Sequence, residues 1–208
     1  MTIRNQTSAR PNQRARKIAL RLLLIGLILA MPFVQSPFSF EGLHQTLEII
    51  GQFLIIFGIM GRAWCTMHIG GQKFTELVTL GPFSVSRNPL YVFSLIATFG
   101  AGLQTGSLLF AILTAFGVWI ILDATVRKEE VALRGRFGDA YEVYCARTPR
   151  YVPKITSWQG QDSVTVNMHL LYRTLLDGSL FFLIVPVAEL IDRLQVVGYF
   201  PVLLKLPF

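Results

Sequence analysis

Residues 88–122 read NPLYVFSLIATFGAGLQTGSLLFAILTAFGVWIIL and contain no charged side chain. A membrane helix needs about 20 apolar residues, so this stretch is too long for one ordinary span. Small and polar residues gather in its middle, from Gly100 to Ser107, where they predict a tight turn. The stretch is therefore expected to form a helical hairpin with arms at residues 90–103 and 108–126.

The first arm of this hairpin is short for a membrane helix. It has about 14 residues, which make a helix of about 21 Å at a rise of 1.5 Å per residue. The hydrocarbon core of a bilayer is about 30 Å thick. The arm is therefore expected to begin in the headgroup region or to cross the membrane only in part.

The composition of the whole chain also favours a membrane protein. Of its 208 residues, 52% are hydrophobic and 15% are charged, whereas charged residues make up about 25% of a typical soluble domain. The formal net charge is +7. Six basic residues and no acidic residue occur between Arg4 and Arg21, at the start of the first apolar run. This positive-inside pattern predicts a cytoplasmic N-terminus and disfavours binding to nucleic acid.

Apolar segments on both sides of the hairpin predict further membrane helices. Residues 18–34 are expected to form an uncleaved first helix, because no small-residue cleavage site follows them. Residues 47–65 predict a second helix, and residues 180–188 belong to a fifth, partly polar one. The predicted fold class is all-α: a polytopic integral membrane protein with about five membrane helices and a central hairpin. The expected location is a bacterial inner membrane.

The chain divides into three regions by composition. Residues 1–17 are basic and polar and are expected to be disordered. Residues 18–154 form the membrane core with its cytoplasmic region, and residues 155–208 hold a linker, a C-terminal membrane helix and an interfacial tail. Whether that last helix spans the membrane fully is left open by the sequence.

Two cysteines are present, Cys65 and Cys145, and both fall on the expected cytoplasmic side. The cytosol keeps thiols reduced, so a disulfide is not expected. Their spacing does not match that of a zinc site, and no metal site is predicted.

The residues best suited to binding or catalysis flank the hairpin. One group lies where the chain enters the hairpin and the other where the chain leaves it. Arg87, Asn88 and Tyr91 lie before or at the start of the first arm, and Glu129 and Glu130 follow the second. A structural interpretation is open for each: a helix cap for Asn88, a membrane-interface aromatic for Tyr91, and solvated helix-surface acids for the glutamates. Folding the hairpin brings the two groups together at the cytoplasmic surface.

Taken in order, these motifs resemble the isoprenylcysteine carboxyl methyltransferase family of integral membrane methyltransferases, which is related to the phospholipid methyltransferases. The family pattern is a glycine-aromatic turn, Arg-His-Pro-x-Tyr, an apolar hairpin, Glu-Glu-x-x-Leu, Phe-Gly, spaced tyrosines and Pro-Arg-x-x-Pro. The matching residues are Gly81-Pro82-Phe83, Arg87-Asn88-Pro89-Leu90-Tyr91, Glu129-Glu130-Val131-Ala132-Leu133, Phe137-Gly138, Tyr141, Tyr144 and Pro149-Arg150-Tyr151-Val152-Pro153.

The resemblance implies an S-adenosylmethionine-dependent methyltransferase. Carboxylates can bind the ammonium or ribose of this cofactor, and an arginine can hold its carboxylate through two hydrogen bonds. No Gly-x-Gly-x-x-Gly follows a strand pattern, which excludes a Rossmann-type enzyme. Catalytic residues are not assigned. The cofactor-binding residues implied by the resemblance are Arg87, Asn88, Pro89, Tyr91, Glu129, Glu130 and Leu133.

One position departs from the family pattern, because Asn88 stands where the family has histidine. An asparagine can donate and accept hydrogen bonds but does not titrate. Asn88 can therefore still bind a ligand through hydrogen bonds, but it cannot act as a proton donor or acceptor in catalysis.

The resemblance does not identify the methyl acceptor. It implies carboxyl O-methylation of isoprenylcysteine-like groups, or more broadly a lipophilic or prenylated acceptor that enters from the bilayer, with membrane lipids as further partners. Two alternatives remain open: a sterol-type NADPH-dependent membrane reductase, and a non-catalytic membrane protein or transporter. A transporter is disfavoured because the hairpin is almost without polar residues at mid-membrane.

Overall fold

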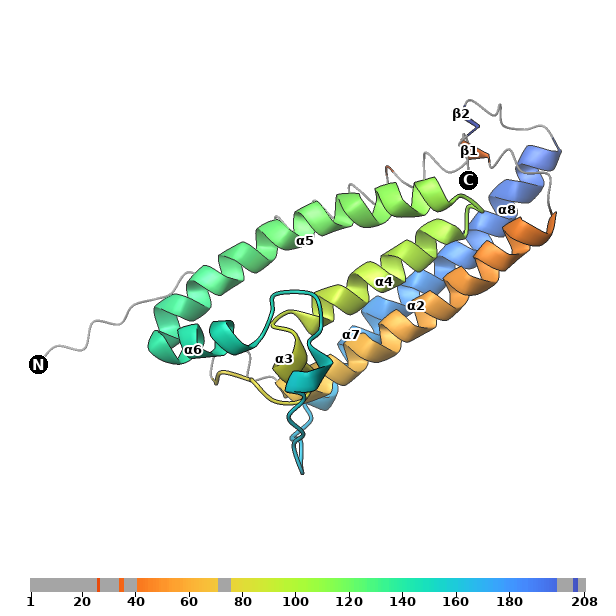
Figure 1. Ribbon diagram of the computed structural model, residues 1–208. Helices are drawn as coiled ribbons and strands as arrows, with labels where there is room; N and C mark the ends of the chain where they lie inside the picture. Colours follow the sequence, from red (N-terminus) through yellow and green to blue (C-terminus); the bar gives the residue numbers. More distant parts are fainter. Residues whose placement is uncertain (1–25, 27–33, 36–40, 71–75, 198–203, 206–208) are drawn as a thin grey trace, which may run out of the picture.

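The computed structural model describes residue 26 and residues 34–35, 41–70, 76–197 and 204–205, and the secondary structure within them is almost entirely helical (Figure 1). A parallel pair of two-residue strands, β1 (Val34–Gln35) and β2 (Leu204–Lys205), is the exception. The helices are α2 (Glu41–Ile69), α3 (Pro82–Val85), α4 (Pro89–Leu103), α5 (Leu108–Phe137), α6 (Asp139–Arg147), η2 (Ile155–Ser157), α7 (Met168–Ser179), η3 (Leu180–Leu183) and α8 (Ile184–Val196).

Three helical segments of the described chain are long and apolar enough to cross a membrane: Gly42–Ile69, Leu108–Phe137 and Met168–Ile191. Helix α4 is a shorter apolar helix beside them. The all-α membrane fold expected from the sequence is confirmed. The predicted first helix at residues 18–34 lies outside the described residues, except for Gly26 and for Val34, which begins β1.

The central hairpin has the predicted form. Its first arm is α4, which ends at Leu103, and α5 begins at Leu108. Ser107 caps α5 by accepting a hydrogen bond from the backbone N–H of Phe110 at 3.3 Å. Helix α5 extends well beyond residue 126, where the sequence pattern placed its end, because Gly138 with φ of 52° is the first residue that breaks the helix.

Helix α2 packs closely along α4 through glycines. A Cβ on Gly58 would lie 2.7 Å from the Cβ of Ala97 and 2.7 Å from the carbonyl oxygen of Phe93. A Cβ on Gly51 would lie 2.6 Å from the carbonyl oxygen of Gly100. Small residues allow helix backbones to approach in this way within a bilayer, where lipid and protein are equally apolar.

The C-terminal helical segment consists of α7, η3 and α8 (Figure 1); α7 lies beside α2, and α8 packs against Phe110 of α5. The segment begins at Met168, well before the apolar residues 180–188 on which its prediction rested. Asn167 caps it by accepting from the backbone N–H of Leu170 at 3.1 Å. Gly178 is buried, and a Cβ added to it would lie 3.1 Å from the side chain of Ile59 on α2.

Large apolar side chains are exposed along α2 and α5. Phe53 is 68% exposed and Met60 66% exposed on α2, while Leu113 and Phe116 are more than half exposed on α5. A soluble protein rarely leaves such continuous apolar faces uncovered. In a bilayer these faces contact lipid tails.

Candidate functional site

The candidate site lies at the end of the bundle where α4 begins and the extended end of α5 meets α6 (Figure 1). The chain after α6 returns across this end and pairs with α3. The backbone N–H of Arg87 donates to Pro149 at 2.9 Å, and that of Lys154 donates to Val85 at 2.9 Å. Segments far apart in the sequence therefore form one rigid surface.

Glu130 is the centre of the charged part of the site. It is 2% exposed, and the guanidinium of Arg150 donates to both of its oxygens, at 3.0 Å from Nε and 2.7 Å from the terminal nitrogen. Arg87 lies 3.5 Å and Arg134 4.0 Å from the same carboxylate. Three positive groups thus surround one negative group.

Glu129 faces a different neighbour. It is 6% exposed and accepts a hydrogen bond from the hydroxyl of Tyr91 at 2.9 Å. Tyr91 is itself buried against Leu122 and Val126 of α5. The structural interpretations as solvated acids and a membrane-interface aromatic are therefore excluded for these residues.

Asn88 and Pro89 begin α4, but not as a conventional cap. Pro89 is buried at the first helical position. The side chain of Asn88 makes no capping hydrogen bond, and its Nδ2 donates instead to the carbonyl of Arg150 at 3.2 Å. The residue at the family's histidine position therefore holds the segment that carries Arg150. Leu133, the last residue implied by the resemblance, is half-buried on α5.

Buried hydroxyls fix the segment after α6 against α3. Ser86 Oγ donates to the carbonyl of Tyr151 at 3.1 Å, and the hydroxyl of Tyr144 donates to the carbonyl of Phe83 at 2.7 Å. Burial raises the pKa of the Tyr144 phenol above its ordinary value. The hydroxyl therefore stays protonated and keeps donating throughout the neutral range.

Four residues of the site were not among those expected: Arg150, Cys145, Asp123 and Tyr151. Cys145 Sγ accepts from Arg87 at 2.7 Å, and Tyr151 donates to Asp123 at 2.7 Å. The hydrogen bond to Glu130 raises the pKa of Arg150, so the guanidinium remains protonated. The Pro-Arg-Tyr stretch of the family pattern contained the signal for Arg150 and Tyr151.

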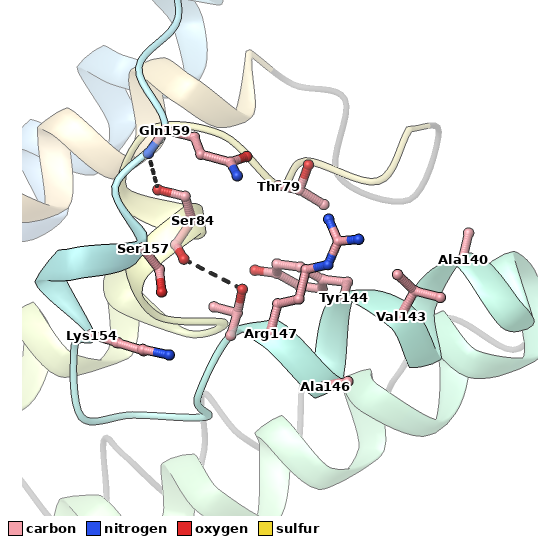
Figure 2. Close-up of a pocket in the computed structure, with 11 residues that line it drawn as sticks. Thr79, Ser84, Ala140, Val143, Tyr144, Ala146, Arg147, Lys154, Ser157 and Gln159 are labelled. Atoms are coloured by element: carbon pink, nitrogen blue, oxygen red, sulfur yellow. Dashed lines mark hydrogen bonds between the residues drawn. The ribbon is translucent and has the colours of Figure 1, made fainter.

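Two cavities open at this surface and share a wall. One, of about 520 Å³, is lined by Arg87, Cys145, Ala146, Arg147, Thr148, Pro149, Val152, Pro153 and Lys154. The other, of about 550 Å³, is shown in Figure 2 and is lined by Thr79, Ser84, Ala140, Val143, Tyr144, Ala146, Arg147, Thr148, Lys154, Ser157 and Gln159. Both have the size of small-molecule sites.

The wall beside Arg87 suits a carboxylate better than a cation. The Nε of Arg87 is buried and has no hydrogen-bond partner among the described residues. Glu130 has both oxygens occupied by Arg150. The carboxylate end of an amino-acid-like cofactor fits this excess of positive charge, whereas Glu130 binds an ammonium only if an arginine first moves away.

The chain was compared with known families and proteins. Residues 43–140 match the family model described as phospholipid methyltransferase. The chain is 27% identical over 191 residues to the nickel-cobalt-cadmium resistance protein NccN of Alcaligenes xylosoxydans xylosoxydans, covering 92% of this chain and 87% of that protein. It is 29% identical over 178 residues to the cobalt-zinc-cadmium resistance protein CzcN of Cupriavidus metallidurans, covering 86% and 82%.

A more distant match is to the enzyme family expected from the motifs. The chain is 28% identical over 109 residues to protein-S-isoprenylcysteine O-methyltransferase of Schizosaccharomyces pombe, covering 51% of this chain and 46% of that protein. No solved structure matches significantly. The resemblance to the isoprenylcysteine carboxyl methyltransferase family is confirmed, and the comparisons indicate a membrane methyltransferase of this type.

Proposed function

Because this chain is a relative of the isoprenylcysteine carboxyl and phospholipid methyltransferases, we propose that it transfers a methyl group from S-adenosylmethionine to a lipophilic acceptor. The observation that carries the proposal is the position of Arg87. It lies within the matched residues 43–140, it lines the cavity of about 520 Å³, and its Nε is buried without a hydrogen-bond partner in the described chain.

Arg87 is assigned to the carboxylate of the cofactor. Its guanidinium is held by Cys145 at 2.7 Å and by Glu130 at 3.5 Å, so its direction is set before a ligand binds. Preorganisation of this kind lowers the entropy lost on binding. Asn88 and Glu130 support the wall through their hydrogen bonds with Arg150, rather than by contacting the cofactor themselves. Pro89 supports it by starting α4.

Bound S-adenosylmethionine supplies a methyl group already activated by its sulfonium. The protein mainly has to orient the reactants and exclude water. A carboxylate acceptor needs no general base. For an amine or phenol acceptor, Glu129 is the candidate base, because its carboxylate is buried and accepts a hydrogen bond from Tyr91 of α4.

Titration calorimetry of the purified protein in detergent tests the proposal. S-adenosylmethionine is expected to bind saturably and NADPH is not. Arg87→Gln removes a charged hydrogen-bond donor worth roughly 1.5–3 kcal/mol, so the affinity should fall about tenfold to a hundredfold. Lys128→Gln, an exposed charge on the same end of α5, is the matched control and should leave the affinity unchanged.

Two results would contradict the proposal. Saturable NADPH binding without S-adenosylmethionine binding would favour the reductase. Unchanged affinity in Arg87→Gln, with melting like that of the parent, would remove Arg87 from the site.

The names of two relatives suggest that the proposed methyl transfer takes place within a metal-resistance system. NccN and CzcN are named as metal resistance proteins, and they match nearly the whole chain. Among the described residues no three side chains of His, Cys, Asp or Glu are grouped as metal ligands. We therefore favour methyl transfer within a metal-resistance system over direct metal binding by the described part of the chain.

The proposed location is a bacterial inner membrane, with the site on the cytoplasmic side. A cysteine at Asp139, beside the site, is expected to react with a membrane-impermeant maleimide only after cells are permeabilised. A cysteine at Gly42, at the opposite end of the bundle, should react in intact cells. Both are placed in a chain with Cys65→Ala and Cys145→Ser. Labelling of the Asp139 position from outside would reverse the topology.

A further inference from the structure

The cavity of about 550 Å³ beside α6 (Figure 2) shares Arg147 and Lys154 with the cavity assigned to the cofactor, but residues such as Ser84 and Val143 line it alone. Two cations and several hydroxyl or amide groups line it, and no carboxylate is among its described lining residues. We propose that this cavity binds a phosphate group, carried by a lipid headgroup or by a soluble phosphate ester. The inference is independent of the methyl-transfer proposal.

The two cations are Arg147 at the end of α6 and Lys154 in the segment that follows. Both are exposed, and neither side chain forms an ion pair or hydrogen bond with another described residue. By contrast, Arg134 pairs with Glu142 at 2.8 Å and Arg127 with Asp123 at 2.6 Å. Two like charges in a cavity whose described lining residues include no carboxylate favour the binding of an anion.

The floor of the cavity is rigid and polar. Ser84 is 4% exposed; its hydroxyl donates to the carbonyl of Gly81 at 2.6 Å and accepts from the backbone N–H of Gln159 at 3.0 Å. Thr148 donates to the carbonyl of Ser84 at 3.3 Å. These bonds, two of which are drawn in Figure 2, hold α3, α6 and the returning segment together around the opening.

The remaining lining groups match the chemistry of a phosphate. Figure 2 shows Arg147, Lys154 and Ser157 around the same opening, contributed by different parts of the chain. A guanidinium forms paired hydrogen bonds with phosphate oxygens, an ammonium adds a point charge, and the hydroxyl of Ser157 can donate a further bond. The volume accommodates the phosphate together with the group that carries it.

Apolar residues beside Lys154 favour a lipid as the carrier. Val152 is 79% exposed, Ile155 80% and Trp158 48%. Exposed apolar and aromatic side chains next to cations are typical of surfaces that lie against anionic headgroups. A lipid phosphate would then reach the cavity while these side chains contact the upper acyl region.

The two cavities can be separated by mutation. Arg147 and Lys154 line both of them, whereas Val143 lines only the cavity of about 550 Å³. Val143 is 53% exposed, so Val143→Trp adds bulk at the opening without disturbing the core. This variant should block the phosphate and leave binding of S-adenosylmethionine unaffected.

The experiment measures phosphate binding in two arms. Full-length protein in detergent is titrated with glycerol 3-phosphate by calorimetry, and immobilised protein in phosphatidylcholine nanodiscs is tested for retention of headgroup-labelled phosphatidic acid. Arg147→Gln with Lys154→Gln should weaken binding at least about tenfold in the arm where the parent binds. Lys128→Gln with Arg136→Gln removes the same charge from exposed positions outside both cavities and should stay within about twofold.

Each result decides for or against the site. Saturable binding that is lost in the double variant and in Val143→Trp supports it, and the arm with tighter binding identifies the carrier. Absence of saturable binding by the parent in both arms overturns it. Equal losses in the two double variants also overturn it, because they would reflect total charge alone. Melting temperatures are compared first, and Arg147→Lys, which retains the charge, should keep most of the binding if a variant proves unstable.

Discussion

Glu130→Gln is expected to lower the free energy of unfolding by about 3–5 kcal/mol, the usual cost of breaking a buried ion pair by removing one partner. Glu130 is 2% exposed, and Arg150 donates to both of its oxygens. With Arg87 and Arg134 also nearby, the glutamine variant would leave three positive groups around a neutral amide. Denaturant titration in mixed micelles measures the change.

Glu142→Gln is the matched control, because Glu142 also pairs with an arginine but is exposed. It accepts from Arg134 at 2.8 Å with a side-chain exposure of 57%. An exposed pair contributes about 0–1 kcal/mol. If the two glutamine variants lose similar small amounts of stability, Glu130 is not the electrostatic centre of the site.

A double-mutant cycle identifies the responsible partner. Arg150→Met alone should also be destabilising, since it leaves Glu130 with only the more distant Arg87 and Arg134. Combined with Glu130→Gln, it should cost less than the sum of the single changes, because the second removal has no intact pair to break. Additive losses would contradict the pairing of these two residues.

Gly58→Ala and Gly135→Ala are expected to change stability in opposite directions, although both replace a helical glycine by alanine. At Gly58 the new methyl would lie 2.7 Å from the Cβ of Ala97 and 2.8 Å from its backbone nitrogen. Helices α2 and α4 would have to separate, and such overpacking costs about 1–3 kcal/mol. The same micelle titration measures the loss.

At Gly135 nothing lies within 4 Å of the added methyl. The substitution there should stabilise the protein by about 0.5–1 kcal/mol, because alanine loses less backbone entropy in a helix than glycine. Stabilisation at both positions would mean that α2 and α4 are farther apart than the structure indicates. The pair of variants therefore tests the helix packing separately from helix propensity.

The hairpin was largely determined by local sequence. A charge-free stretch interrupted by glycine, glutamine, threonine and serine can satisfy its backbone in a membrane only as two helices joined by a turn. For this reason the predicted start of the second arm, Leu108, and the predicted end of the first, Leu103, agree with the structure. The end of α5 was placed too early because charged residues suggested water, although a helix can continue into water.

The sequence also determined which short segments form the candidate site, since motifs on both sides of a hairpin must meet at one membrane surface. It did not decide what each glutamate contacts. Adjacent residues on a helix point about 100° apart, so Glu129 meets Tyr91 of α4 while Glu130 meets Arg150. Only tertiary structure decided this, because the position of Arg150 depends on how the chain after α6 folds back on α3, through hydrogen bonds between residues more than sixty positions apart.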